Sequence, residues 1–187
     1  QLMEEFKKIE LKVKSKIMSY YVTKLDDGNN AEVIYYFWVE IVTCPKCKAE
    51  IEGHVHYLLS DDHEHYLHRT RVAFCKKCHE VTEIPITSDS FQCNKCNEIT
   101  EVMKGTIRSG KFYCPECGHV CLLGRMENNH CSPKIKLFAV NYLDPITKER
   151  GFKKTTIFDD KLIEKAKKDL EKIVETLPIP NSFIPTH

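Results

Sequence analysis

Between residues 93 and 117 the chain reads CNKCNEITEVMKGTIRSGKFYCPEC, with one Cys-x-x-Cys pair at each end. Two further pairs of the same form lie upstream, at Cys44/Cys47 and Cys75/Cys78. Two thiolates separated by two residues can bind one metal ion from a single tight turn, and two such pairs complete a tetrahedral site. The sequence therefore predicts two zinc ions, held by eight cysteines: Cys44, Cys47, Cys75, Cys78, Cys93, Cys96, Cys114 and Cys117.

The residues around these cysteines favour tight turns. Pro45 and Pro115 fix φ directly after the first cysteine of their pairs. Asn97 and Gly118 follow the second cysteine of theirs, and both tolerate the left-handed backbone that turns amides toward the sulfurs. Such N–H···S bonds would tune a bound metal.

The pairs can be combined in two ways. Sequential pairing joins the first pair to the second across 27 residues, 48–74, and the third to the fourth across 17 residues, 97–113. The shorter spacer is usual for a zinc ribbon, and the longer one can hold a hairpin with an extended loop. The alternative joins the two inner pairs and brings the outermost pairs together across a long loop, so we rank it lower.

Zinc is preferred over an iron–sulfur or rubredoxin-like iron site and over disulfides. Sulfur ligands and tetrahedral geometry do not by themselves separate zinc from iron.

The net charge restricts the partners. The 187 residues carry a formal charge of +1 with cysteine counted as neutral. Eight thiolates add eight negative charges and two zinc ions add four positive ones, which brings the chain to about −3. Any DNA contact must then use local patches. Two stretches are basic: Lys104, Arg108 and Lys111 in the first, and Lys148, Arg150, Lys153 and Lys154 in the second.

No stretch has the pattern of a cleavable signal or the roughly 18 consecutive apolar residues of a membrane span. Cysteines paired as Cys-x-x-Cys without such a signal indicate a reducing compartment. We therefore expect a cytoplasmic protein with no membrane partner.

Hydrophobic periodicity predicts helices near both ends and strands between them. Apolar residues recur at three- or four-residue steps over 2–18, which favours a helix. Residues 33–42 are dense in β-branched and aromatic side chains and predict a strand that runs directly into Cys44. Further expected elements are an extended segment at 20–24, a turn at 26–30, a ribbon hairpin at 99–112, a strand at 136–142 and a helix from Asp159 or Asp160 to about residue 176.

These elements predict an α+β fold in which two zinc ribbons with short antiparallel sheets are flanked by N- and C-terminal helices. Four regions are expected: a helix and β-hairpin (1–43), a first ribbon (44–92), a second ribbon (93–135), and a strand, helix and linker tail (136–187).

Other potential ligands are given ordinary roles. The histidines between the first two pairs do not have the His-Glu-x-x-His spacing of zinc peptidases, so we expect them to be exposed. They are His54, His56, His63, His65 and His68. Cys121 and Cys131 lie outside the pairs, near His119 and His130, and free or packed thiols are favoured there over a third, partial metal site.

No motif in the chain predicts catalysis. The sequence has no Gly-rich phosphate loop, no Gly-x-Ser-x-Gly elbow and no zinc-deaminase pattern. A zinc ion held by four thiolates has no open position at which to activate water. We therefore assign no catalytic residue.

Several stretches together carry a resemblance. They are Tyr35-Tyr36-Phe37-Trp38-Val39-Glu40, the four cysteine pairs, Leu137-Phe138-Ala139-Val140-Asn141-Tyr142, Gly151-Phe152-Lys153-Lys154 and a charged helix ending at Leu177-Pro178-Ile179-Pro180. In this order they resemble the zinc-ribbon segment of large prokaryotic adenine-specific DNA methylases that methylate an amino group. The resemblance covers roughly residues 30–187.

The resemblance implies an accessory region, because the catalytic parts of that family are missing. Those enzymes transfer methyl from S-adenosylmethionine and carry a Gly-rich cofactor motif and an Asp-Pro-Pro-Tyr or Asn-Pro-Pro-Tyr motif. Asp144-Pro145-Ile146-Thr147 lacks the second proline and the aromatic residue. The expected partners are the remainder of a methyltransferase chain and DNA, with S-adenosylmethionine bound only by the intact enzyme. A stand-alone ribbon adaptor for protein or nucleic acid, and an iron-based redox protein, are the alternatives.

Overall fold

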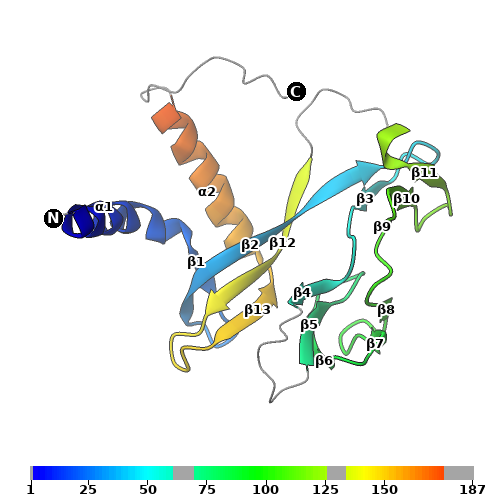
Figure 1. Ribbon diagram of the computed structural model, residues 1–187, viewed down its shortest axis with the longest axis horizontal. Helices are drawn as coiled ribbons and strands as arrows, with labels where there is room; N and C mark the ends of the chain where they lie inside the picture. Colours follow the sequence, from blue (N-terminus) through cyan, green and yellow to red (C-terminus); the bar gives the residue numbers. More distant parts are fainter. Residues whose placement is uncertain (1, 61–69, 126–133, 175–187) are drawn as a thin grey trace. The chain divides into compact units, whose positions relative to one another are not determined.

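The computed structural model describes residues 2–60, 70–125 and 134–174 (Figure 1). The predicted α+β class is confirmed: helices α1 (Leu2–Ile17) and α2 (Ile157–Val174) accompany small antiparallel sheets. Two 3₁₀ turns, η1 and η2, cover Met18–Tyr20 and Leu123–Arg125. The strands are β1 Val22–Lys24, β2 Asn30–Thr43, β3 Glu50–Glu52, β4 Leu58–Ser60, β5 Thr70–Phe74, β6 Val81–Pro85, β7 Ser90–Gln92, β8 Ile99–Glu101, β9 Ile107–Arg108, β10 Lys111–Tyr113, β11 Val120–Leu122, β12 Ile135–Leu143 and β13 Arg150–Lys154.

The chain divides into two compact units. The first comprises residues 1–32 and 156–187, and the second comprises residues 33–155. All the cysteine pairs lie in the second unit.

In the first unit, α1 forms where the apolar periodicity predicts a helix. None of its residues is buried, and the apolar stripe faces solvent: Phe6 and Ile9 are each 62% exposed. Of the segment 20–24 that was expected to be extended, only Val22–Lys24 forms a strand, β1, because Tyr20 ends the 3₁₀ turn η1. β1 pairs with the beginning of β2 through a tight turn at Gly28, whose φ is +84°. An exposed apolar helix face of this kind typically marks a site of contact with another protein segment.

The start of α2 is fixed by a side-chain cap. The backbone N–H and the hydroxyl of Thr156 both donate to Asp159 Oδ2, at 2.7 and 2.9 Å. Thr156 is therefore the N-cap, and Asp159 is the third helical residue that reaches back to it. The prediction that Asp159 or Asp160 would itself be the N-cap is wrong by three or four residues. Asp159 is buried, and its other oxygen, Oδ1, accepts a 2.6 Å bond from the buried Thr23 hydroxyl on β1, which compensates the carboxylate for lost water.

The second unit is built around β2 and β12. The predicted strands at 33–42 and 136–142 are confirmed as parts of these longer strands. β12 lies between β2 and β13, and β3 pairs with the end of β2 (Figure 1). β12 has a continuous run of buried residues from Leu137 to Asn141, as expected for a central strand.

Smaller sheets follow along the chain. β4, β5 and β6 form one, β7 and β8 a second, and β9, β10 and β11 a third. The predicted hairpin over 99–112 is only partly present. β8 pairs with β7, and the hairpin proper joins β9 to β10 through Ser109 and Gly110, both at positive φ.

The main apolar core of this unit gathers residues from distant parts of the sequence. Val39 of β2, Phe74 of β5, and Phe138 and Ala139 of β12 pack with Tyr57. A second cluster surrounds Cys44 and Cys114 and includes the fully buried Phe112. The core therefore places the cysteine turns beside packed side chains.

Candidate metal centres

The eight paired cysteines lie in two groups of four. Centre A consists of Cys44, Cys47, Cys114 and Cys117, and all four sulfurs lie within 4.8 Å of one another. The Sγ–Sγ distances are 3.8 Å between Cys44 and Cys117 and 3.6 Å between Cys47 and Cys114.

Centre B consists of Cys75, Cys78, Cys93 and Cys96, whose sulfurs also lie within 4.8 Å of one another. Cys75 Sγ is 3.5 Å from Cys96 Sγ, and Cys78 Sγ is 3.6 Å from Cys93 Sγ. Cys75 and Cys93 are buried, so this centre is enclosed on the side of the first cysteine of each turn.

This grouping corrects the sequential pairing. The first pair combines with the fourth and the second with the third, which is the nested arrangement that we ranked lower. The boundary between the expected ribbons 44–92 and 93–135 depended on the sequential pairing, which the structure does not have.

The physical reason lies in the segments 52–57 and 102–107 of the two linkers. They run antiparallel and bond to each other: Tyr57 N–H donates to Val102 O at 2.8 Å, and Ile107 N–H donates to His54 O at 2.9 Å. The Thr106 hydroxyl also donates to Glu52 O at 2.6 Å. Paired linkers bring the outermost cysteines together, so the long loop between them is bridged by its own hydrogen bonds.

The sulfur geometry fits a tetrahedral ion. Four thiolates at the usual zinc–sulfur distance of about 2.3 Å lie about 3.8 Å from one another. In each centre two separations, of 3.5–3.8 Å, agree with that value, and the others do not exceed 4.8 Å. They are far longer than the roughly 2.05 Å of a disulfide bond. Both centres can therefore hold a divalent ion with little movement of the chain.

Each cysteine pair occupies the same backbone turn. The carbonyl of the first cysteine accepts the N–H of the residue four positions on, and its own N–H donates to the carbonyl five positions on. The residue after the second cysteine has positive φ: 68° at Gly118 and 57° at Asn97, as predicted, but also 63° at Lys48 and 58° at His79. In centre B the N–H groups of Lys77 and Lys95 point at Cys75 Sγ and Cys93 Sγ, both at 3.4 Å.

The thiols within each centre differ in acidity. Burial opposes ionisation of Cys44, but backbone N–H groups of Cys47 and Lys46 outweigh it and lower its pKa to about 6. Burial likewise opposes ionisation of Cys93, whose pKa is lowered to about 7 by the N–H groups of Cys96 and Lys95. Burial and the neighbouring sulfurs raise the pKa of Cys78 to about 12. Four thiolates crowd one another unless a cation is shared between them.

A fifth turn has the same backbone form without cysteine. Between β12 and β13, Lys148 N–H donates to Asp144 O at 3.1 Å and Asp144 N–H donates to Glu149 O at 2.9 Å. Lys148 has a φ of 62°. The Asp144 carboxylate takes the place of the thiolate and accepts N–H bonds from Ile146 and Thr147, at 2.7 and 2.9 Å.

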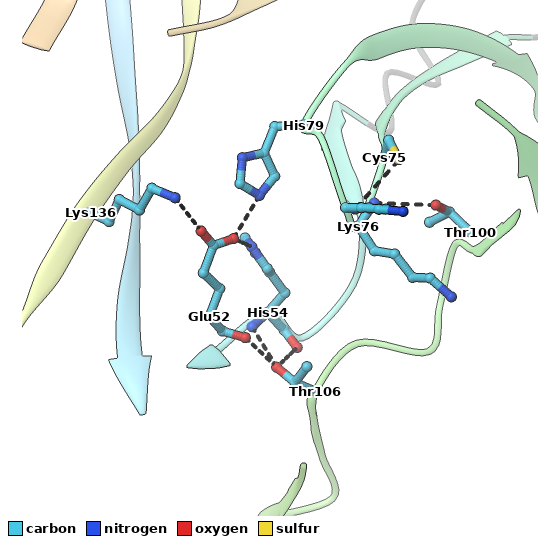
Figure 2. Close-up of polar contacts among 9 residues, drawn as sticks. Glu52, His54, Cys75, Lys76, His79, Thr100, Thr106 and Lys136 are labelled. Carbon is cyan, nitrogen blue, oxygen red and sulfur yellow. Dashed lines mark hydrogen bonds and ion pairs between the residues drawn. The ribbon is translucent and has the colours of Figure 1, made fainter. Parts of the chain in front are cut away.

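A third group of potential ligands was missed by the sequence prediction. Glu52, His54 and His79 each offer one ligand atom, and these atoms lie within 4.8 Å of one another (Figure 2). His54 was expected to be exposed but is 7% exposed, because its ring packs 5.0 Å from the rings of Phe74 and Phe138. His56 is exposed as predicted, and His63, His65 and His68 lie outside the described residues.

Glu52 is the centre of this group. Its Oε2 lies 3.1 Å from His54 Nε2 and 2.7 Å from His79 Nε2, and Lys136 Nζ lies 2.7 Å from its Oε1. Burial opposes ionisation of Glu52, but these three partners together hold the pKa of the carboxyl well below its usual range. The sequence signal that could have found the group is Glu-x-His after a strand, together with a histidine directly after a Cys-x-x-Cys pair.

Some of the residues that were predicted to contact DNA interact with other side chains of this chain. Arg108 stacks on the Tyr113 ring at 4.0 Å, and Lys104 Nζ lies 2.6 Å from a Glu101 carboxylate oxygen. Lys111 is exposed on β10. In the second basic stretch Lys154 pairs with Glu80 at 3.2 Å. Cys121 packs against the core of centre A, in agreement with a packed thiol, and Cys131 lies outside the described residues.

Among the residues that the structure describes, neither helix is long and apolar enough to cross a membrane. Comparison of the chain with protein-family models, with curated proteins and with solved structures found no match.

Proposed function

We propose that this chain is a zinc-binding structural module in which two tetrathiolate zinc ions fix the nested fold. The observation that carries the proposal is the convergence of eight cysteines into two groups of four, in which all sulfurs lie within 4.8 Å of one another and two pairs in each group are 3.5–3.8 Å apart. Four sulfur ligands close the coordination sphere, so each zinc supplies folding energy and no open catalytic position.

The sheets around the two centres need the stabilisation that zinc supplies. The sheets around the two centres consist mostly of strands of two to five residues, which are too short to be stable alone. Structural zinc binding contributes about 10–16 kcal/mol in small zinc domains at pH 7, enough to replace a large core. Removing zinc with a chelator should therefore unfold residues 44–117.

Metal analysis tests this module. We expect two zinc ions per chain in purified folded protein, and one fewer after Cys96→Ser, with local unfolding around centre B. The matched control is Cys121→Ser, which should keep both ions. One zinc or fewer in fully folded protein, or an unchanged count and melting curve for Cys96→Ser, would contradict the proposal.

We further propose that the module is an accessory region of a DNA amino-methyltransferase, which it scaffolds and helps to hold on DNA. The support is the resemblance carried by the aromatic strand, the four cysteine pairs and the strand at 137–142. The exposed apolar face of α1, with Phe6 and Ile9 each 62% exposed, supplies the kind of surface that binds another protein segment.

The sequence of the intact gene tests the methyltransferase proposal. We expect the same reading frame to encode a Gly-rich cofactor motif and an Asp- or Asn-Pro-Pro-Tyr motif. Deleting residues 44–117 from that enzyme should abolish methylation, whereas a deletion elsewhere on its surface should not. A reading frame without these motifs would instead favour a stand-alone adaptor, for which the open face of α1 also provides the binding surface.

A further inference from the structure

We propose that Glu52, His54 and His79 form a third metal site, which binds a divalent transition-metal ion, with zinc preferred, more weakly than the two tetrathiolate centres. The inference stands apart from the methyltransferase proposal, because it depends only on side chains of the second unit.

The ligand set is the first argument. Two imidazole Nε2 atoms converge on one carboxylate oxygen, at 3.1 Å from His54 and 2.7 Å from His79 (Figure 2). Two histidines and one carboxylate are a recurrent ligand set for zinc and for iron(II), with further positions taken by water. In a tetrahedral site with bonds of about 2.1 Å, ligand atoms lie about 3.4 Å apart, so Glu52 Oε2 must move away from His54 Nε2 by about 0.3 Å and from His79 Nε2 by about 0.7 Å.

The surrounding contacts hold these ligands in place. The Thr106 hydroxyl donates to the backbone carbonyl of Glu52 at 2.6 Å. The N–H of His54 donates to the same hydroxyl at 3.0 Å, and the N–H of His79 donates to Cys75 O at 3.0 Å. A site whose ligands are oriented by such outer contacts gains affinity because less order must be created on binding.

Charge and access also favour a cation. His79 directly follows Cys78, and a zinc ion with four thiolates carries a formal charge of −2, which offsets a dication beside it. The side chains of His79 and Glu52 are 16% and 20% exposed, so an ion can enter from that side. The rings of Phe74 and Phe138 enclose the other side, next to His54.

The competing arrangement is a hydrogen-bonded cluster, in which both histidines keep a proton on Nε2 and donate to Glu52. The two arrangements differ in where the Nε2 protons are and in how many ions the chain binds. They also differ in the effect of Lys136, which neutralises Glu52 in the hydrogen-bonded cluster and competes with a metal ion in the other.

The test starts from the full chain with both tetrathiolate centres filled by zinc. Cobalt(II) is titrated in, and binding is followed by visible absorption and by metal analysis after gel filtration. We expect one further ion to bind with ligand-field bands of nitrogen and oxygen coordination and without a thiolate-to-cobalt charge-transfer band. Glu52→Gln and His54→Gln should lose this ion and keep two zinc ions. His56→Gln, in the exposed histidine of the same segment, is the matched control and should bind like the parent chain.

Lys136→Met gives a second measurement if His54→Gln fails to fold. Removing an ammonium group so close to the carboxylate should tighten cobalt binding about tenfold or more. Nitrogen NMR of the imidazoles should show metal-shifted Nε2 signals at His54 and His79. The proposal is overturned if no third ion binds, if His54→Gln binds it unchanged, or if both rings keep Nε2 protons in the presence of cobalt.

Discussion

Replacing Cys114 by serine separates the nested arrangement from the sequential one. In the nested arrangement Cys114 shares centre A with Cys44, Cys47 and Cys117, so the variant should lose the ion of centre A and keep that of centre B. Cysteines without metal react with iodoacetamide, and metal-bound thiolates are protected. Mass spectrometry of the alkylated protein should therefore find label on Cys44 and Cys47 and little on Cys93 and Cys96.

The size of the effect follows from the loops that each centre closes. Centre A joins cysteines separated by residues 48–113, whereas centre B joins cysteines separated by residues 79–92, which are 66 and 14 residues. Loop-closure entropy then costs about 1.4 kcal/mol more at centre A, or about tenfold in affinity, when the bonds to metal are alike. We therefore expect centre B to fill first when zinc is added to the apo chain, and the centre B ion to survive in the Cys114→Ser variant.

Two results would refute this reasoning. Label on Cys93 and Cys96, with Cys44 and Cys47 protected, would show that Cys114 belongs with the third pair as in sequential ribbons. Loss of both ions together would show that the centres do not bind independently. Cys121→Ser, beside centre A but outside it, should leave the labelling pattern unchanged.

Three further predictions test other parts of the chain. Thr23→Val removes the 2.6 Å bond to the buried Asp159 and should lower the unfolding free energy by about 1.5–3 kcal/mol, measured by urea denaturation with zinc present; an unchanged midpoint would contradict that role. Gly105→Ala places a Cβ 2.1 Å from His54 O, so the paired linkers must separate, at a cost of about 3 kcal/mol in unfolding free energy. Hydrogen exchange of the Ile107 amide, which donates to His54 O, should then become faster. Unchanged protection of that amide would contradict the proposed pairing of the linkers. The chain alone should transfer no methyl group from labelled S-adenosylmethionine to mixed-sequence DNA, and should bind DNA weakly, with a log–log salt slope that rises by about 0.9 per phosphate contact. Replacing Lys104, Arg108 and Lys111 together by alanine should weaken DNA binding for all sequences alike. If this triple variant binds DNA as well as the parent chain, the surface that carries these residues more readily faces protein.

Local features of the fold were predictable because they depend on neighbouring residues. The helix at 2–18, the strand at 33–42 and the left-handed positions at Asn97 and Gly118 follow from periodicity, β-branching and backbone freedom. The choice of partner for each cysteine pair depends on hydrogen bonds between linkers that are distant in sequence, such as Ile107 N–H to His54 O. Spacing allows both pairings, so spacing alone could not decide.

The Glu52 group was missed for a related reason. The histidine at 79 is contributed by a cysteine turn and the carboxylate by β3, and only the tertiary packing joins them. His54 is buried against two aromatic rings, one of them from β12, which begins 81 residues later in the chain at Ile135. A histidine that alternates with valine, as in His54-Val55-His56, gives no sign of such a position by itself.

The turn at Asp144 bears on the order in which the protein assembles. It keeps the shape of a cysteine turn with a carboxylate as the internal acceptor, so this backbone shape is stable without a metal. The four cysteine turns can then form early, from contacts within six residues of chain. Zinc would act later in folding, by joining the preformed turns that the paired linkers bring together. Newly made protein in zinc-poor cells would be expected to hold formed turns in an open chain, with its thiols exposed to oxidation until the ion arrives.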